Sequence, residues 1–317
     1  MTSRWRLVSW VTASVLVLGA GGFLAFRRIA RLHTVPGTDD ARAFALVNDR
    51  AYAIVGSSGY EVRAIDLTSG DYVRLAAGEG DGEAIAADDK WVVWSVCDVR
   101  GDVMPCRGRT LTVSLAGGAP RELLDDAATR IVVAKQRAYM VNDRALRVAD
   151  LERKTEPEAI AIGVEDVAAD ESYVYALTAS TLRRLPHGSR NPQELARSLR
   201  DASWMSLGHD GAYVACQNSR RDDGEVTYVP FDGSPPVVLA RGLRNPERPV
   251  AWGASVAFIH AIPDAHDNSL AVLTLSLVPR AGGDRRTLRD HFSGDLVSDG
   301  RRLYVVVYDR VIRIPGE

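Results

Sequence analysis

The sequence predicts an all-β fold made of repeated sheets arranged in a ring, and three observations support this prediction. A unit of four short runs separated by polar turns recurs with a period near 40 residues. The second run of several units is apolar on both faces, as expected for a strand covered by sheets on each side. Gly and Pro occur throughout, and long helical heptads are missing. Such units cannot bury their own two faces and must stack around an axis, which is the arrangement of a β-propeller.

The first turn of each unit sets the period. It reads "NDR" at 48–50, "DDK" at 88–90, "KQR" at 135–137, "DES" at 170–172, "HDG" at 209–211, "WGA" at 252–254 and "SDG" at 298–300. The turn centres are therefore 40, 47, 35, 39, 43 and 46 residues apart. Asp, Asn and Gly suit these positions because they hydrogen-bond to the nearby backbone or accept a positive φ.

The strands on either side of the turn follow the same repeat. A bulky apolar run comes next each time, as in "AYAIV" at 51–55, "AYMV" at 138–141 and "LYVVVY" at 303–308. The third run alternates polar and apolar residues more regularly, as expected nearer the rim.

Residues 41–317 hold seven such units, and the seventh lacks its fourth run. We therefore expect a seven-bladed propeller in which roughly residues 32–40 supply the missing outer strand. Pro36 restricts that strand to an edge position. The alternative is six blades and an irregular hairpin.

Residues 1–32 are expected to be a membrane segment, with 33–40 as linker. The stretch from Leu7 to Phe26 carries no charge and would span about 30 Å as a helix, enough to cross a bilayer core. Arginines flank it on both sides. The alternative is a signal peptide cleaved after Ala20-Gly21-Gly22, but the apolar residues continue beyond that point.

The cysteines indicate the compartment. Cys97 and Cys106 lie nine positions apart in one loop, a spacing that suits a local disulfide of the kind that persists outside the cytosol. Two unpaired thiols are the alternative, and Cys216 lies in an apolar run typical of a core. We expect a single-pass protein of a bacterial inner membrane with its propeller on the periplasmic side, or a secreted propeller if the segment is cleaved.

Composition and motifs exclude several functions. The formal net charge of −2 argues against a nucleic-acid partner. No nucleophile elbow, Cys-x-x-Cys pair or phosphate-binding glycine loop is present. "HAIPDAHDN" at 260–268 contains imidazole and carboxylate groups but fits no metal signature. No cofactor or metal is expected, although a catalytic site assembled from distant units would leave no local motif.

Loop length suggests where a partner binds. The loops between second and third strands are short in units three and seven but long at 97–109, 217–225 and 262–268. Their charged residues form the candidate binding surface: Arg100, Arg107, Arg109, Arg220, Arg221, Asp222, Asp223, Asp264 and His266. Arginine is enriched at binding hot spots, and a disulfide would pre-order the longest loop. Ordinary solvated hairpin tips are the alternative.

The innermost strands offer a second set of candidates around the central channel. Charged residues near their beginnings are Glu83, Arg130, Glu165, Asp166 and Asp295. Convergence of several of these would favour an enzyme, whereas a narrow channel would favour binding.

The repeats resemble those of bacterial extracytoplasmic propellers of the TolB type. The resemblance covers about 275 residues and rests on "SDGRRLYVVV", "GHDGAYVACQ", "YVPFDGSPPVVLA" and "LVPRAGGDRRTL". The Trp-Ser-Pro-Asp-Gly box of that family is absent, so a role in the Tol system is not implied. The resemblance implies a rigid disc used mainly for binding. We expect a membrane-anchored protein-binding or assembly module with an envelope protein or peptide as its partner. The alternatives are a hydrolase or lyase acting on a glycan or lactone, and a structural propeller without a ligand.

Overall fold

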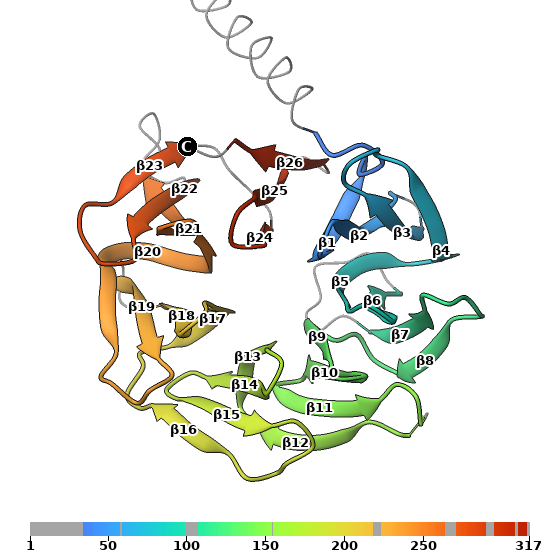
Figure 1. Ribbon diagram of the computed structural model, residues 1–317, viewed down its shortest axis with the longest axis horizontal. Coiled ribbons are helices and arrows are strands. Elements are labelled where there is room, and N and C mark those ends of the chain that lie inside the picture. The colour runs from blue at the N-terminus through green and yellow to red at the C-terminus, as the bar shows by residue number, and fades with distance from the viewer. Residues whose placement is uncertain are drawn as a thin grey trace, which may run out of the picture.

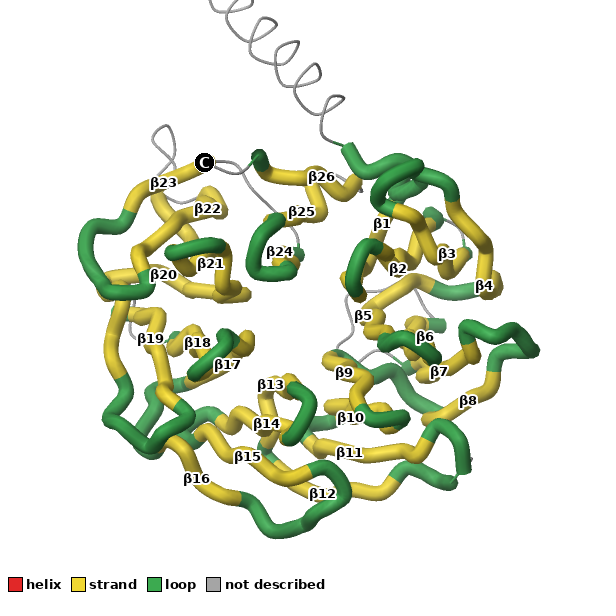
Figure 2. Tube along the Cα trace, viewed as in Figure 1, coloured by secondary structure: helices red, strands yellow, loops and turns green. Residues whose placement is uncertain are grey.

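The computed structural model shows an all-β propeller, as predicted (Figure 1). It describes residues 34–57, 59–98, 107–153, 155–217, 223–263, 271–289, 295–307 and 310–315. Antiparallel sheets surround a central axis, with the first strand of each unit innermost and the fourth outermost. Within the described residues the chain consists of strands, loops and turns (Figure 2). None of those residues belongs to a helix long and apolar enough to cross a membrane, and 7–26 lies outside them.

Four sheets contain four strands each in chain order. The first is β1 (Ala41–Val47), β2 (Arg50–Val55), β3 (Tyr60–Asp66) and β4 (Tyr72–Gly78). The second is β5 (Asp81–Ala87), β6 (Trp91–Cys97), β7 (Gly108–Ser114) and β8 (Arg121–Leu124). The third is β9 (Arg130–Ala134), β10 (Arg137–Asn142), β11 (Ala145–Asp150) and β12 (Glu158–Ile162). The fourth is β13 (Val164–Ala169), β14 (Tyr173–Thr178), β15 (Leu182–Pro186) and β16 (Gln193–Ala196).

The remaining strands form a seven-stranded and a three-stranded sheet. The larger is β17 (Ala202–Leu207), β18 (Gly211–Cys216), β19 (Gly224–Pro230), β20 (Val237–Trp252), β21 (Ser255–Pro263), β22 (Ala271–Pro279) and β23 (Arg286–Arg289). The smaller is β24 (Leu296–Ser298), β25 (Leu303–Val307) and β26 (Arg310–Ile314).

The prediction of seven separate blades, or alternatively of six blades and an irregular hairpin, is wrong because β17 to β23 form one continuous sheet. The described residues form six hydrogen-bonded sheets, and only four of them are four-stranded. The difference arises at β20, whose first half pairs with β19 and whose second half pairs with β21. Pro246 and Pro249 lie within this strand, and a proline cannot donate a hydrogen bond to a neighbouring strand. Register shifts at these positions accommodate the prolines, and the strand is continuous.

The predicted first turns are confirmed in every unit. Each joins the innermost strand to the second strand, as at β9–β10, where Lys135 and Gln136 adopt φ of 50° and 62°. In an antiparallel sheet, successive connections alternate between the two ends. We call the end that carries these first turns, and the loops between third and fourth strands, the turn end. We call the opposite end, where the innermost strands begin, the mouth end.

Neighbouring sheets pack through one aromatic ring on each second strand. These rings belong to Tyr52, Trp94, Tyr139, Tyr175, Tyr213, Phe258 and Tyr304, and each is at most 2% exposed. Such burial of large rings is a major part of the hydrophobic stabilisation of the ring.

The chain before β1 meets β26, which lies on the other side of the ring closure. Thr34 forms an isolated antiparallel bridge with Ile312, and the Val35 N–H donates to the Val311 carbonyl at 2.8 Å. The buried Thr38 hydroxyl donates to the Val35 carbonyl and accepts from the Val311 N–H. The contact is thus a short one, with one bridge outside the named strands.

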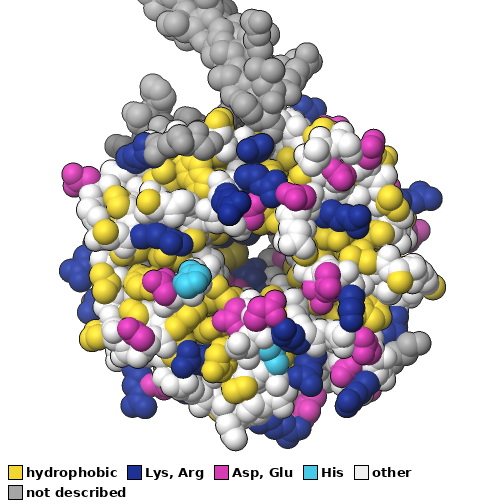
Figure 3. Space-filling model, in the orientation of Figure 1, with side chains coloured by type: hydrophobic (Ala, Val, Ile, Leu, Met, Phe, Trp, Pro, Cys, Tyr) yellow, Lys and Arg dark blue, Asp and Glu magenta, His cyan; other side chains and the backbone are white. Residues whose placement is uncertain are grey.

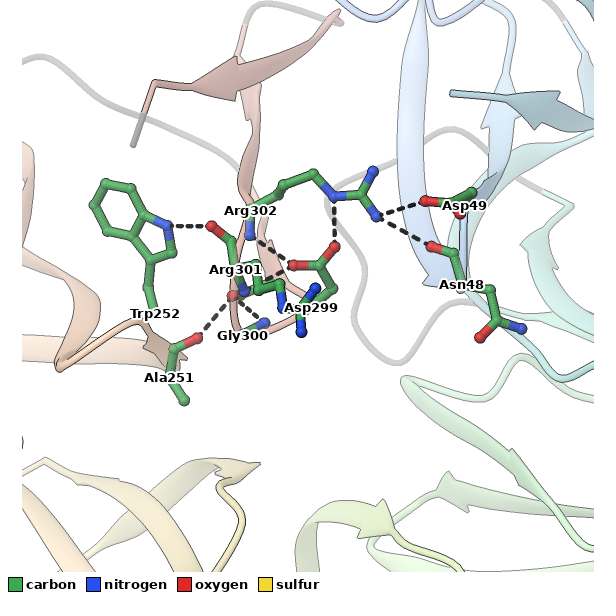
Figure 4. Close-up of polar contacts among 9 residues, drawn as sticks. Asn48, Asp49, Ala251, Trp252, Asp299, Gly300, Arg301 and Arg302 are labelled. Atoms are coloured by element: carbon green, nitrogen blue, oxygen red, sulfur yellow. Dashed lines mark hydrogen bonds and ion pairs between the residues drawn. The ribbon is translucent and has the colours of Figure 1, made fainter. Parts of the chain in front are cut away.

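Polar contacts at the turn end link the last unit to both of its neighbours (Figure 4). The Trp252 indole donates to the Arg301 carbonyl at 3.1 Å, and the Ser298 hydroxyl donates to the Ala251 carbonyl at 2.7 Å. On the other side, the Arg302 guanidinium pairs with Asp49 at 3.1 Å. The β24–β25 turn therefore ties β20 to the β1–β2 turn.

Candidate functional site

Polar and aromatic side chains gather where the innermost strands begin. Different units contribute them: Glu83 on β5, Arg130 on β9, Asp166 on β13, Trp204 on β17, Arg248 on β20 and Asp295 before β24. Figure 3 shows from one side that the ring is hollowed at its centre. We call Arg130, Asp166, Trp204, Arg248 and Asp295 the mouth cluster.

Trp204 is the centre of the mouth cluster. The Arg130 guanidinium carbon lies 3.7 Å from the centroid of the Trp204 ring, and the Arg248 guanidinium carbon lies 4.3 Å from it. Cation–π contacts of this kind hold the planar guanidinium groups in place. About 28% of the Arg130 side chain and 29% of the Arg248 side chain stay accessible. Two arginines from different units are thus presented together in fixed positions.

Asp166 joins three units at their inner edges. It is buried, and its carboxylate lies 3.5 Å from the Arg130 Nε. It also accepts hydrogen bonds from the Val167 N–H at 2.9 Å and from the Met205 N–H of β17 at 2.7 Å. Burial raises the pKa of Asp166 to about 6, although Arg130 and the two N–H groups oppose the rise.

Arg248 occupies an unusual backbone conformation. Its φ is 50°, in the left-handed region that residues other than Gly rarely adopt. Its guanidinium forms an ion pair with Asp295. Burial, and then the nearby charge of Arg130, lowers the pKa of Arg248 to about 10, so it stays protonated at neutral pH. Such strain persists only where surrounding contacts impose it, and it is common at functional sites.

The sequence anticipated part of this cluster. Arg130, Asp166 and Asp295 do converge, whereas Glu165 forms an ion pair with Arg144 instead. Trp204 and Arg248 were missed as site residues. Their signal was their position, since each lies near the beginning of a run assigned to an innermost strand, "WMSLG" and "RPVAW".

The long-loop residues are only partly described. Arg107 and Arg109 follow the gap in the β6–β7 loop, and Arg109 lies 3.8 Å from Asp98. Asp223 lines a cavity of about 370 Å³ with Arg200, Glu225, Val238, Arg241 and Gly242. Six of the predicted binding residues lie outside the described residues: Arg100, Arg220, Arg221, Asp222, Asp264 and His266.

The three cysteines lie at different places in the ring. Cys97 is disulfide-bonded, and Cys106, its predicted partner, lies outside the described residues. The Cys97 Sγ lies 3.9 Å from Glu83 Oε2, close to the mouth end. Cys216 is a buried free thiol, and burial raises its pKa to about 11, so it is an unreactive core residue.

The histidine of the 260–268 segment belongs to the core. His260 is 2% exposed, with Nε2 3.0 Å from the Ser276 hydroxyl and Nδ1 3.2 Å from the Ala261 carbonyl. Both ring nitrogens therefore have protein partners. Within the described part of the chain no three potential metal ligands lie together, and Asp264, His266 and Asp267 lie outside that part.

Comparisons with known proteins show the fold alone. No family model matches the chain, and no curated protein matches it significantly in sequence. A chain of a mitotic checkpoint complex is similar in structure, with a TM-score of 0.59 and 11% identity over 88% of this chain and 92% of that chain. The N-terminal domain of Nup159 gives a TM-score of 0.54 and 10% identity over 89% and 91% of the two chains. These similarities agree with a β-propeller.

Proposed function

We propose that this chain is a protein-binding or assembly module whose partner docks at the mouth end. In this proposal residues 7–26 anchor it in a bacterial inner membrane, the ring lies on the periplasmic side, and the partner is an envelope protein or peptide. The mouth cluster carries the proposal, because Arg130 and Arg248 are held in place on Trp204 yet remain partly accessible. Trp and Arg are the residues that most often dominate binding energy.

Topology supports the same end of the ring. The loops between second and third strands open at the mouth end, so Arg107, Arg109 and Asp223 surround the side on which the cluster lies. A side chain already held in its bound geometry loses little conformational entropy on binding. A rigid ring with fixed arginines is therefore suited to capturing a partner without rearrangement.

Site-specific photo-cross-linking in membranes tests the proposal. A photoreactive residue replaces Arg107 at the mouth end or His209 at the turn end, both of which are exposed. We expect a defined adduct from position 107 and none from position 209. Trp204→Ala should reduce that adduct at least tenfold, and trimming the 217–225 loop should reduce it further.

Tyr72→Ala is the matched control for Trp204→Ala. Tyr72 also carries an arginine over its ring, since the Arg63 guanidinium lies 4.3 Å from it, but it is on the outermost strand β4. This variant should leave the adduct unchanged. Equal adducts from both ends, or an adduct that survives Trp204→Ala, would contradict docking at the mouth, and no adduct at all would favour a structural propeller.

A hydrolase or lyase acting on a glycan or lactone is the second candidate. The observation in its favour is Asp166, a buried carboxyl group with a pKa of about 6 beside Arg130. Asp166→Asn should abolish such an activity while leaving cross-linking from position 107 intact. If the unaltered protein hydrolyses neither model lactones nor glycosides, and Asp166→Asn loses the cross-link from position 107, the enzymatic candidate is wrong.

A further inference from the structure

A cavity opens at the turn end between the third and fourth sheets, at the opposite end of the ring from the mouth cluster. Its volume is about 300 Å³, at the lower end of the range for small-ligand sites. Both sheets contribute to it, β10 to β12 on one side and β14 with the β15–β16 loop on the other. Figure 1 shows these two sheets side by side.

The base of the cavity is apolar. Tyr139, Val148, Ile160 and Val174 form it, and the first and last of these are at most 1% exposed. A medium-sized apolar group placed there would be removed from water at a gain of roughly 25 cal/mol per Å² of buried surface. The cavity is thus suited to a ligand with one aliphatic part.

Two of the three arginines that line the cavity have carboxylate partners. Arg190 pairs with Glu158, and Arg153 lies 3.7 Å from Asp150. Among the described residues this leaves Arg137 as the arginine of the cavity without an ion-paired carboxylate.

The Arg137 guanidinium occupies space that the absence of a side chain at Gly188 leaves open. A Cβ atom at Gly188 would lie 2.5 Å from a terminal nitrogen of Arg137, so any side chain at 188 would displace the guanidinium. Gly188 also has φ +79°, where other residues are strained. The Tyr139 hydroxyl lies beside the same two groups. Burial raises its pKa, and Arg137 and the Gly188 N–H oppose the rise. Donors from two sheets therefore converge at one point above the apolar base.

We propose that this cavity binds a carboxylate that carries one medium-sized aliphatic group, with the carboxylate on Arg137 and the aliphatic group against Val148 and Ile160. A guanidinium binds a carboxylate through two parallel hydrogen bonds, which fixes orientation as well as affinity. Both a free acid and the C-terminal residue of a peptide present this chemistry.

Titration of the full-length chain with N-acetyl-leucine, followed by calorimetry and ligand-observed NMR, tests this site. N-acetyl-leucinamide is the matched ligand, because it has the same aliphatic group without the charge. We expect the acid to bind at least tenfold more tightly than the amide, and Arg137→Gln to remove that difference. A pentapeptide of four glycines and a C-terminal leucine distinguishes the sources, since tighter binding than N-acetyl-leucine indicates a peptide terminus.

Three further variants make the outcome decisive. Thr155→Trp, at an exposed position on the rim, should block the cavity without altering Arg137. Arg285→Gln removes an exposed arginine elsewhere and should leave binding unchanged, as should Trp204→Ala at the mouth end. The proposal is overturned by equal binding of acid and amide, by binding that persists in Thr155→Trp, or by no binding of any of the three probes at millimolar concentration.

Discussion

Two neighbouring junctions between sheets each contain a buried tyrosine at the equivalent position of the second strand, but a different residue faces its ring. Between the fourth sheet and the β17–β20 strands, the Tyr175 ring stacks on Phe231 with centroids 4.8 Å apart. Between the third and fourth sheets, the Tyr139 ring faces His187 with centroids 5.7 Å apart, and its hydroxyl lies 2.9 Å from His187 Nδ1. The first junction is closed by stacked rings, whereas a cavity opens beside the second.

The facing residue comes from an equivalent position in both cases. His187 follows Pro186 at the end of β15, and Phe231 follows Pro230 at the end of β19. A tyrosine provides the buried ring at both junctions, and the residue after the third strand of the next unit is what differs between the closed junction and the one beside the cavity. The repeated scaffold thus differs at the cavity by His187, where the next junction has Phe231, and by Gly188 beside it.

The largest effect is expected from removing the tyrosines. Tyr175→Ala should lower the free energy of unfolding by about 3–5 kcal/mol, as for other buried aromatic residues. Tyr139→Ala should cost about 1 kcal/mol less, because no stacked ring is lost and a cavity already adjoins it. Urea denaturation of both variants measures this, and an equal or greater loss at Tyr139 would show that the two junctions do not differ.

A pH dependence is expected from Asp166, which lies against both junctions at the mouth end. Its pKa of about 6 in the folded protein lies above the ordinary 3.8, so between these values the folded state holds a proton that the unfolded chain has released. The free energy of unfolding should therefore fall by about 2 kcal/mol, relative to Asp166→Asn, as the pH rises from 4 to 6. Unfolding curves at several pH values measure this, and a constant difference between the two proteins would contradict it.

Truncation of the facing residues should give a smaller difference. Phe231→Ala should cost about 2 kcal/mol through lost burial and stacking, and His187→Ala about 1 kcal/mol through a lost hydrogen bond. Thermal unfolding of the pair measures the order of the two effects. The reverse order would mean that the histidine closes its junction as effectively as the phenylalanine does.

The smallest effect on stability is expected from replacing His187 with the phenylalanine that the next junction has at the equivalent position. His187→Phe should stay within about 1 kcal/mol of the unaltered protein, because a new ring contact offsets the lost hydrogen bond to Tyr139. The same variant should weaken binding of N-acetyl-leucine if the larger ring enters the cavity. Unfolding and titration of one preparation give both results, and a loss of several kcal/mol would show that the junction cannot accept a second ring.

Local patterns in the sequence determined the strands, the turns and the all-β class. Apolar runs such as "AYMV" and turns such as "KQR" act over a few residues, so their structure follows from side-chain size, β-branching and turn chemistry. The same reasoning placed Arg130, Asp166 and Asp295 near the beginnings of innermost strands. Stacking was also implied, because a repeat that cannot cover its own faces must be covered by its neighbours.

Only the tertiary structure decided how the units join and which side chains meet. Strand β20 stays continuous with Asn245 before Pro246, and Arg248 before Pro249, both at positive φ, and with register shifts on each side of Glu247. Contact of Trp204 with Arg130 and Arg248, and of Arg137 with Gly188, joins residues from different units. Such contacts depend on the angle and spacing between packed sheets, which the whole core sets and no single stretch of sequence encodes.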